Sequence, residues 1–147
     1  MTLEGQVELA APPEAVWALL EDPERVARLL PGVEQVEPAG ADRYRVRVRY
    51  TLGPVSGTYT GTVELAGREP PRALRLKVSL RGAPGFVEGD GGIELAPHGR
   101  GTRAHYRGQF RLGGMLAAVG QRMALPAARK TVEEFFRAVA AELGRTQ

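Results

Sequence analysis

Cysteine is absent from the sequence, so disulfide bonds and thiolate metal sites are excluded. The absence also excludes the class of small secreted domains that disulfides hold together. The first five residues form neither a basic stretch nor an apolar one, so we expect no signal peptide. No hydrophobic run approaches the length of a membrane span, and we expect a cytoplasmic protein.

Side chains suited to catalysis or metal binding are also few. The only histidines are His98 and His105, which lack the spacing of metal ligands, and no Gly-x-Ser-x-Gly motif occurs. Glu88 and Asp90 could serve a cyclase as an acid or base, although solvated acids in a glycine-rich strand are the favoured interpretation. Gly89 and Gly91 indicate a β-bulge or a close helix approach there. We expect no catalytic residues, no metal and no cofactor.

Alternating apolar residues predict most of a β-sheet. The clearest period of two covers 44–52, and similar patterns cover 3–10, 55–65, 74–80 and 104–112, with a weaker strand that ends near 95. The turns between them are short and rich in glycine and proline, which indicates an antiparallel meander. With 147 residues and a hydrophobic fraction of 43%, the chain 1–147 has the size of one domain with a real core.

Helical signals occupy two places in the sequence. After the first strand, Pro13 begins one short helix and Asp22 caps another. From Met115 to Leu143 the period becomes helical, and Pro126 predicts either a kink or two abutting helices. The predicted fold is therefore α+β: a curved antiparallel sheet of about seven strands around a long C-terminal helix, with two short helices after the first strand.

The inward side chains of this fold would enclose either a cavity or a filled core, and we favour a cavity because pockets are mostly apolar with few polar groups. Buried tyrosine hydroxyls need a partner, which a quinone or sterol carbonyl, water or backbone could supply. The Gly113–Leu116 turn is either a cavity mouth or an ordinary strand-to-helix turn. The candidate ligand-binding residues are Tyr44, Val46, Val48, Tyr50, Tyr59, Leu76, Val78, Tyr106, Phe110, Met115, Val119, Met123 and Phe135.

Arginine accounts for almost all of the positive charge, since lysine occurs only at Lys77 and Lys130. The alternation places a dense set of arginines on the outer face of the sheet, where it could bind anionic lipid or an acidic protein. Pairing with Glu64, Glu88 or Glu94 across strands is the slightly favoured interpretation, because outer sheet faces are usually solvated. No nucleic-acid motif occurs, so we expect no nucleic-acid partner. The candidate partner surface, called here the arginine face, is Arg43, Arg45, Arg47, Arg49, Arg75, Arg103 and Arg107.

Several motifs occur in an order that is similar to one known family. They are Pro-Glu-Ala-Val-Trp at 13–17, Leu-Pro-Gly-Val at 30–33, Leu-Gly-Pro-Val-Ser-Gly at 52–57, the glycine-rich stretch at 89–92, and the long final helix. With these motifs the sequence resembles the family of the G subunit of carbon monoxide dehydrogenase, within the START-like, polyketide-cyclase-like superfamily. The likeness covers nearly the whole chain.

The resemblance implies a helix-grip fold with an internal cavity and an accessory role beside molybdenum hydroxylases of the carbon monoxide dehydrogenase type. Such proteins are thought to act in membrane recruitment, at the inner face, or in handling a quinone. Many continue into a membrane-attaching tail, whereas the sequence given ends at Gln147, so we expect no such anchoring. The leading hypothesis is a non-catalytic protein that holds a quinone or lipid; a cyclase or hydratase and an interaction protein that uses the arginine face are the alternatives.

Overall fold

A seven-stranded antiparallel sheet curves around one long helix in the computed structural model, which describes residues 1–145. The fold class predicted from the sequence is therefore confirmed. The elements in chain order are β1 (Thr2–Leu9), α1 (Pro13–Leu20), α2 (Pro23–Leu29), β2 (Val33–Pro38), β3 (Arg43–Leu52), β4 (Val55–Glu69), β5 (Ala73–Gly82), β6 (Gly85–His98), β7 (Gly101–Gly114), α3 (Met115–Ala118) and α4 (Gln121–Arg145).

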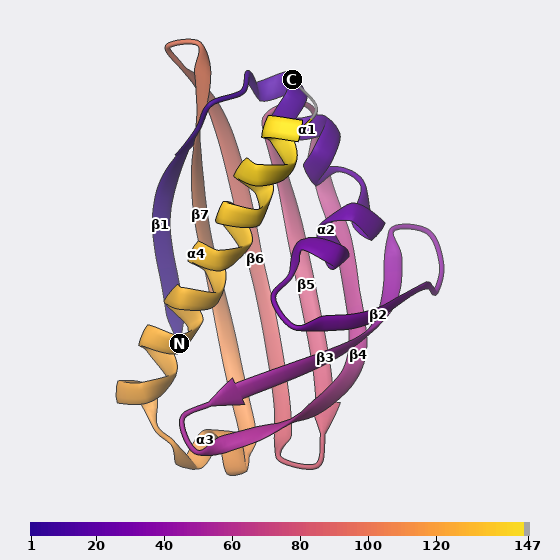
Figure 1. The fold of residues 1–147 in the computed structure, drawn as a ribbon, viewed down its shortest axis with the longest axis vertical. Helices are drawn as coiled ribbons and strands as arrows, with labels where there is room; N and C mark the ends of the chain where they lie inside the picture. Colours follow the sequence, from indigo (N-terminus) through magenta and orange to yellow (C-terminus); the bar gives the residue numbers. More distant parts are fainter. Residues whose placement is uncertain (146–147) are drawn as a thin grey trace.

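The strands follow the order β1-β7-β6-β5-β4-β3-β2, with every neighbouring pair antiparallel. Strands β2 to β7 form a meander, and β1 lies at the far edge beside β7, where Leu9 is opposite Thr102. In Figure 1 the sheet wraps so that β2 and β3 pass across the front, while α4 runs diagonally over the concave face of β6 and β7. The apolar side chains on that face thus meet the helix.

The two short helices close one end of this wrap, at the top of Figure 1. Pro13 occupies the first turn of α1, and the side chain of Asp22 caps α2 by accepting from the backbone N–H groups of Glu24 (3.1 Å) and Arg25 (3.3 Å). The apolar face of α1, including Trp17 and Leu20, is buried against α4 and the sheet. Both helices thus form where the capping signals predict them.

Strand β2 was not predicted. It is a six-residue edge strand with half-buried Val33 and Val36, and its pairing with β3 shifts register between Val33 and Gln35. The shift breaks the period of two, so the two valines are three residues apart and resemble no strand pattern. A short edge strand of this kind leaves little signal in the sequence.

The last helical segment is divided at Gly120, not at Pro126 as the sequence suggested. Gly114 and Gly120 have φ angles of +66° and +78°, and they flank the four residues of α3. These left-handed conformations favour glycine and end the helical path. Pro126 lies near the start of α4, and the helix continues through it.

The core forms three connected regions. The largest lies at the upper end, between α1, α4 and the strands, and includes the fully buried Val16 and Val139. A second packs Ala27 of α2 on Val46 and Val63, and a third joins Leu52, Tyr59 and Leu116 at the lower end. Among residues 1–145, no helix is both long and apolar enough to cross a membrane.

Candidate functional site

A cavity of about 310 Å³ lies between the concave face of the sheet and α4. Its volume is at the lower end of the range typical for small-molecule sites, and its lining is almost wholly apolar. The helix contributes Ala128, Val132 and Phe135, and the opposite wall includes Leu76 and Leu80 of β5. The helix therefore covers the concave face without filling the space above it.

The empty space follows from glycines on the inward phase of β6 and β7. Gly91 and Gly108 are directly opposite each other, and Gly89 is opposite Phe110. A Cβ atom placed on Gly89 would find as its nearest atoms the Gln109 carbonyl oxygen and the Phe110 Cβ, both at 3.8 Å. The wall therefore faces open volume at this point.

The expectation of a bulge or a close helix approach at Gly89 and Gly91 was wrong. The register of β6 continues without a shift against both β5 and β7, and the nearest neighbours of a Cβ built on either glycine belong to β7, not to α4. Side chains that would reach α4 are absent at these positions. The glycines thus open the cavity rather than bend the strand.

Tyr59 is one of three tyrosines that line the cavity. Its side chain is 0% exposed, and its hydroxyl has no hydrogen-bond partner among residues 1–145. Burial raises the pKa of the Tyr59 phenol, and neighbouring Tyr50 raises it further, so the group remains a protonated donor at neutral pH. A buried hydroxyl without a partner destabilises a protein by about 1–3 kcal/mol. A ligand that presents an acceptor would remove this penalty.

The candidate ligand-binding residues divide into two groups. Those that line the cavity are Val48, Tyr50, Tyr59, Leu76, Val78, Tyr106, Phe110 and Phe135. The structure places the others outside the lining, and these are Tyr44, Val46, Met115, Val119 and Met123.

Each of the five excluded residues has a different environment. Val46 packs into the core under α2, and half-buried Tyr44 lies at the start of β3 opposite Val63. Met115 and Met123 are 61% and 43% exposed, and half-buried Val119 packs on the lower core region. Periodicity assigns a face to each residue, but it does not give the depth along the strand or the rotation of a short helix.

Several lining residues were missed from the sequence. Leu30 and Pro31, from the connection after α2, contribute to the wall, as do the glycines of β6 and β7. The glycines could have been found by extending the inward phase of β6 and β7 through them. No local pattern identifies Leu30 and Pro31, because only the wrapping of the chain brings them to the cavity.

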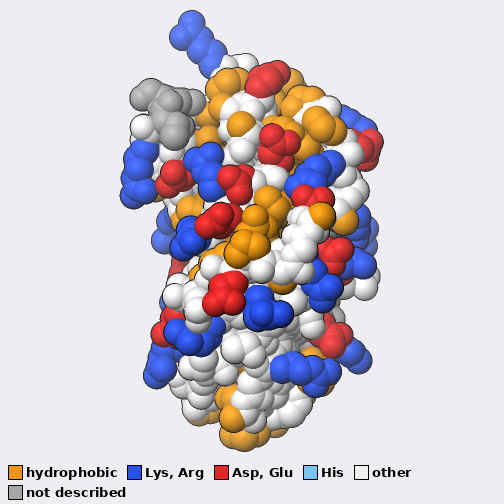
Figure 2. Space-filling view, turned by 90° about the vertical axis from the view of Figure 1, so that its right-hand side faces the viewer, with side chains coloured by type: hydrophobic (Ala, Val, Ile, Leu, Met, Phe, Trp, Pro, Cys, Tyr) orange, Lys and Arg blue, Asp and Glu red, His pale blue; other side chains and the backbone are white. Residues whose placement is uncertain are grey.

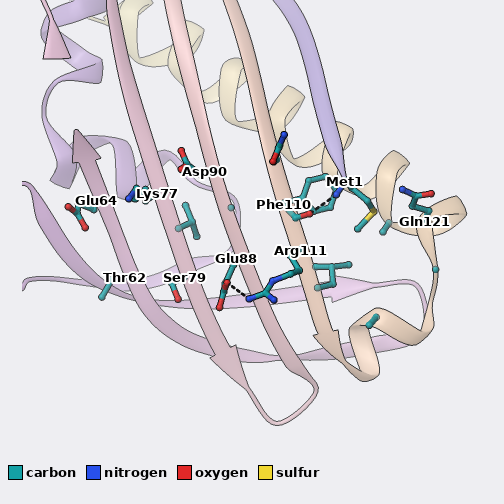
Figure 3. Close-up of a pocket in the computed structure, with 17 residues that line it drawn as sticks. Met1, Thr62, Glu64, Lys77, Ser79, Glu88, Asp90, Phe110, Arg111 and Gln121 are labelled. Carbon is teal, nitrogen blue, oxygen red and sulfur yellow. Dashed lines mark hydrogen bonds and ion pairs between the residues drawn. The ribbon is translucent and has the colours of Figure 1, made fainter. Parts of the chain in front are cut away.

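A second, more open hollow of about 910 Å³ adjoins the cavity and shares Phe110, Leu112 and Ala124 with it (Figure 3). Strand β1 pairs with β7 only as far as Gln109, after which the amine of Met1 donates to the carbonyl of Phe110 (2.9 Å). The last residues of β7 therefore have no strand on that side. The cavity approaches the surface here, between the end of β7 and the junction of α3 with α4.

The carboxylates considered for a cyclase point away from the cavity. Asp90 pairs with Arg75, and Glu88 pairs with Arg111 at 2.7 Å, both on the outer face of the sheet. Figure 3 shows the Glu88–Arg111 pair beside the open hollow. Neither carboxylate is in place to act on a molecule between sheet and helix.

All seven residues of the arginine face lie on the outer phase of their strands. Three make ion pairs: Arg47 with Glu34 at 3.4 Å, Arg103 with Glu8 at 3.1 Å, and Arg75 with Asp90. No ion pair within the described part of the chain involves Arg43, Arg45, Arg49 or Arg107. Of the acidic partners predicted, Glu88 pairs with Arg111 at 2.7 Å, whereas Glu64 and Glu94 make no ion pair in the described part of the chain. Part of the positive charge therefore remains available to a partner.

Comparison with known proteins agrees with this geometry. The family model described as CoxG, the G subunit of carbon monoxide dehydrogenase, matches residues 5–144. A crystal structure of a conserved protein from Geobacillus kaustophilus superposes with a TM-score of 0.93 at 31% identity, over 99% of this chain and 97% of that one. No curated protein matches the sequence.

More distant structures share the fold alone. A START superfamily protein from Mycobacterium smegmatis has a TM-score of 0.72 at 15% identity and 99% coverage of both chains. An aromatase/cyclase from Streptomyces sp. R1128 has a TM-score of 0.69 at 21% identity, over 99% of this chain and 94% of that one. The same wrap of sheet on helix therefore occurs in an enzyme as well as in a START protein.

Proposed function

Because the chain belongs to the CoxG family of carbon monoxide dehydrogenase, we propose that it is a non-catalytic accessory protein that holds a quinone or lipid for a molybdenum hydroxylase. The observation that carries this proposal is the apolar cavity with the unpartnered hydroxyl of Tyr59. An apolar molecule with one acceptor oxygen would fill the space and satisfy the hydroxyl. A quinone carbonyl and a lipid ester both have this chemistry.

The volume suggests how such a molecule would be held. A cavity of about 310 Å³ suits a ring system or the end of an acyl chain rather than a whole long-chain lipid. The remainder of the ligand would pass the end of β7, where the cavity approaches the surface beside Phe110 and Leu112. The polar end would meet Tyr59 and the apolar chain would leave through this gap.

Native mass spectrometry tests the proposal directly. The protein is incubated with a lipid and quinone extract of its source cells and sprayed without detergent, and a reproducible adduct is expected. Gly89→Leu should abolish the adduct, because its Cβ fits at 3.8 Å from its neighbours and the rest of the side chain enters the cavity. The fold should be retained, as measured by circular dichroism.

Gly92→Leu is the matched control. It lies on the same strand, three residues along. Its backbone borders the cavity, but it is opposite Arg75, so an added side chain would project from the outer face, where a Cβ meets nothing closer than 3.5 Å. It should retain the adduct. A clean apo mass for the unaltered protein would contradict the proposal, and a ligand of changed mass after incubation would favour an enzyme of the cyclase class.

The arginine face is the surface we assign to the hydroxylase. Its support is the set of arginines without ion pairs, chiefly Arg45 on β3 and Arg107 on β7. Reversing these two charges should weaken binding of the purified hydroxylase at least tenfold by biolayer interferometry while leaving the ligand adduct intact. Unchanged binding would remove the arginine face from the proposal.

A further inference from the structure

Three uncharged segments of the chain are connections at one end of the sheet, although a quarter of all residues are charged. They are residues 50–60, 82–87 and 112–121. In the structure these segments form the β3–β4 turn, the β5–β6 turn, and the end of β7 with α3. Each is thus a connection at the lower end of the sheet in Figure 1.

The three segments touch one another and form one surface, which we call the tip. A Cβ on Gly57 would collide with the ring of Pro84, Gly85 is paired with Gly114, and Gly53 lies against the sulfur of Met123. In Figure 2 the lower end of the molecule is white and orange, and the charged side chains stop above it. Segments far apart in the sequence therefore build a single uncharged end.

The tip carries the two large hydrophobic side chains that are exposed in the described part of the protein. Met115 in α3 is 61% exposed and Met123 in the first turn of α4 is 43% exposed. Both are unbranched and flexible, which suits a surface that meets varied apolar groups. Glycines with positive φ lie on both sides of α3 and separate this short helix from β7 and α4. These features do not resemble a protein-binding hot spot, where aromatic anchors are enriched.

Three arginines border the tip, and one of them, Arg111, is paired with Glu88 at 2.7 Å. The guanidinium carbons of Arg81 and Arg111 lie 5.3 and 5.2 Å from the centre of the Phe86 ring, which holds both beside the β5–β6 turn. Arg122 is exposed at the start of α4. In the sequence, no acidic residue occurs from 95 to 132. We call Arg81, Arg111 and Arg122 the basic fringe.

The opposite end of the molecule carries charges of both signs, whereas the tip carries none. Residues 1–42 hold nine of the seventeen acidic residues and two of the twenty basic ones. Four of these acids, Glu14, Glu21, Asp22 and Glu24, lie in or beside α1 and α2, at the end remote from the tip. Arg25 and Arg28 of α2 and Arg68, which donates to the carbonyl of Glu21, lie at the same end, so the contrast between the two ends is one of charged against uncharged surface.

We propose that the tip docks on an anionic lipid surface, with Met115 and Met123 among the acyl chains and the basic fringe on the phosphates. An uncharged apolar end bordered by arginine matches the layered chemistry of a lipid leaflet. The cavity approaches the surface beside α3, so a docked protein would exchange its ligand with the bilayer without exposing it to water. This inference rests on the proposed function for the identity of the cargo, but the docking itself is measured separately.

Vesicle co-sedimentation is the test, with vesicles of phosphatidylcholine alone and vesicles in which a third of the lipid is phosphatidylglycerol. The full chain should bind the anionic vesicles and lose most binding in high salt. The double variant Met115→Glu, Met123→Glu should lose at least tenfold in vesicle affinity, and Arg122→Glu should lose severalfold. The altered side chains are exposed, so the fold should persist, and thermal denaturation checks this.

Arg100→Glu, in the β6–β7 turn at the far end, makes the same charge change as Arg122→Glu and should bind vesicles like the unaltered protein. Equal loss in both arginine variants, or full binding by the double methionine variant, would overturn the docking proposal. An adduct in native mass spectrometry without vesicle binding would refute the docking while leaving the proposed function standing. Vesicle binding without an adduct would refute the proposed function while leaving the docking standing.

Discussion

The two ends of the molecule share one sheet and one helix, yet they pack differently. At the upper end α1 and α2 cover the strands, and Val16, Leu20 and Val139 are almost completely buried. At the lower end the cover is the four-residue helix α3, and glycines replace side chains on the facing strands. The upper core is therefore continuous beneath two helices, whereas the lower end combines a smaller core with the apolar cavity beside it.

Equivalent leucine truncations provide the largest expected contrast between the ends. Leu20 is 1% exposed in the upper core and Leu116 is 0% exposed in α3. We expect Leu20→Ala to lower the free energy of unfolding by about 4 kcal/mol and Leu116→Ala by about 2 kcal/mol, since a short helix between two glycines can collapse into the gap. Urea denaturation followed by circular dichroism measures both.

A loss at Leu116 equal to that at Leu20 would break the comparison, because the lower end would then be packed as rigidly as the upper one. Phe135→Leu offers an intermediate, since Phe135 lies in the upper core region and also lines the cavity. We expect it to fall between the two truncations in stability.

Substitution of Tyr59 should have a smaller effect, which raises the stability of the free protein and lowers its retention of the ligand. Tyr59→Phe removes a buried hydroxyl that lacks a partner, so the free protein should gain about 1 kcal/mol in stability. The same change should weaken retention of the ligand about tenfold, because the acceptor of the ligand loses its donor. Thermal denaturation of the free protein and ligand competition followed by native mass spectrometry measure the two results. A less stable free protein would mean that the hydroxyl already has a partner, such as buried water.

The smallest effect is a dependence of stability on alkaline pH. Because the pKa of Tyr59 is raised by burial and by Tyr50, the unfolded chain releases this proton first as the pH increases. The contribution is therefore fully present below the ordinary tyrosine pKa of about 10 and is lost as the pH rises through the higher folded value. Tyr59→Phe should flatten the decline in urea midpoint above about pH 10. An unchanged slope would place Tyr59 in contact with water.

The sequence alone predicted the sheet and both short helices because their signals are local. Alternation in β3 and β7 and the capping side chain of Asp22 act over a few residues, and the structure preserves them. Strand β2 was not predicted because a register shift interrupts the alternation of its side chains. The break in the last helical segment was predicted at Pro126 and not at Gly120, because proline is ordinarily the stronger helix breaker. In the structure the backbone turns at Gly120, a glycine with positive φ.

The candidate site was less predictable for a physical reason. Period-two alternation assigns each strand residue to a face, so Val48, Tyr59 and Phe110 were placed inward. It carries no information on how far the sheet curls, and so it could not separate Val46, which meets α2, from Val48, which meets the cavity. The exposed positions of Met115 and Met123 depend on how α3 turns between its glycines.

What the sequence by itself determined is the α+β order, the inward face of each long strand and the excess of arginine on the outer face, since all of these follow from periods of two and 3.6 residues. Only the tertiary structure decided that the core is hollow at Gly89, Gly91 and Gly108 and that three uncharged turns meet at one end. These properties depend on contacts between residues far apart in the chain. A local pattern records which way a side chain points, whereas the curvature of the sheet decides what it meets.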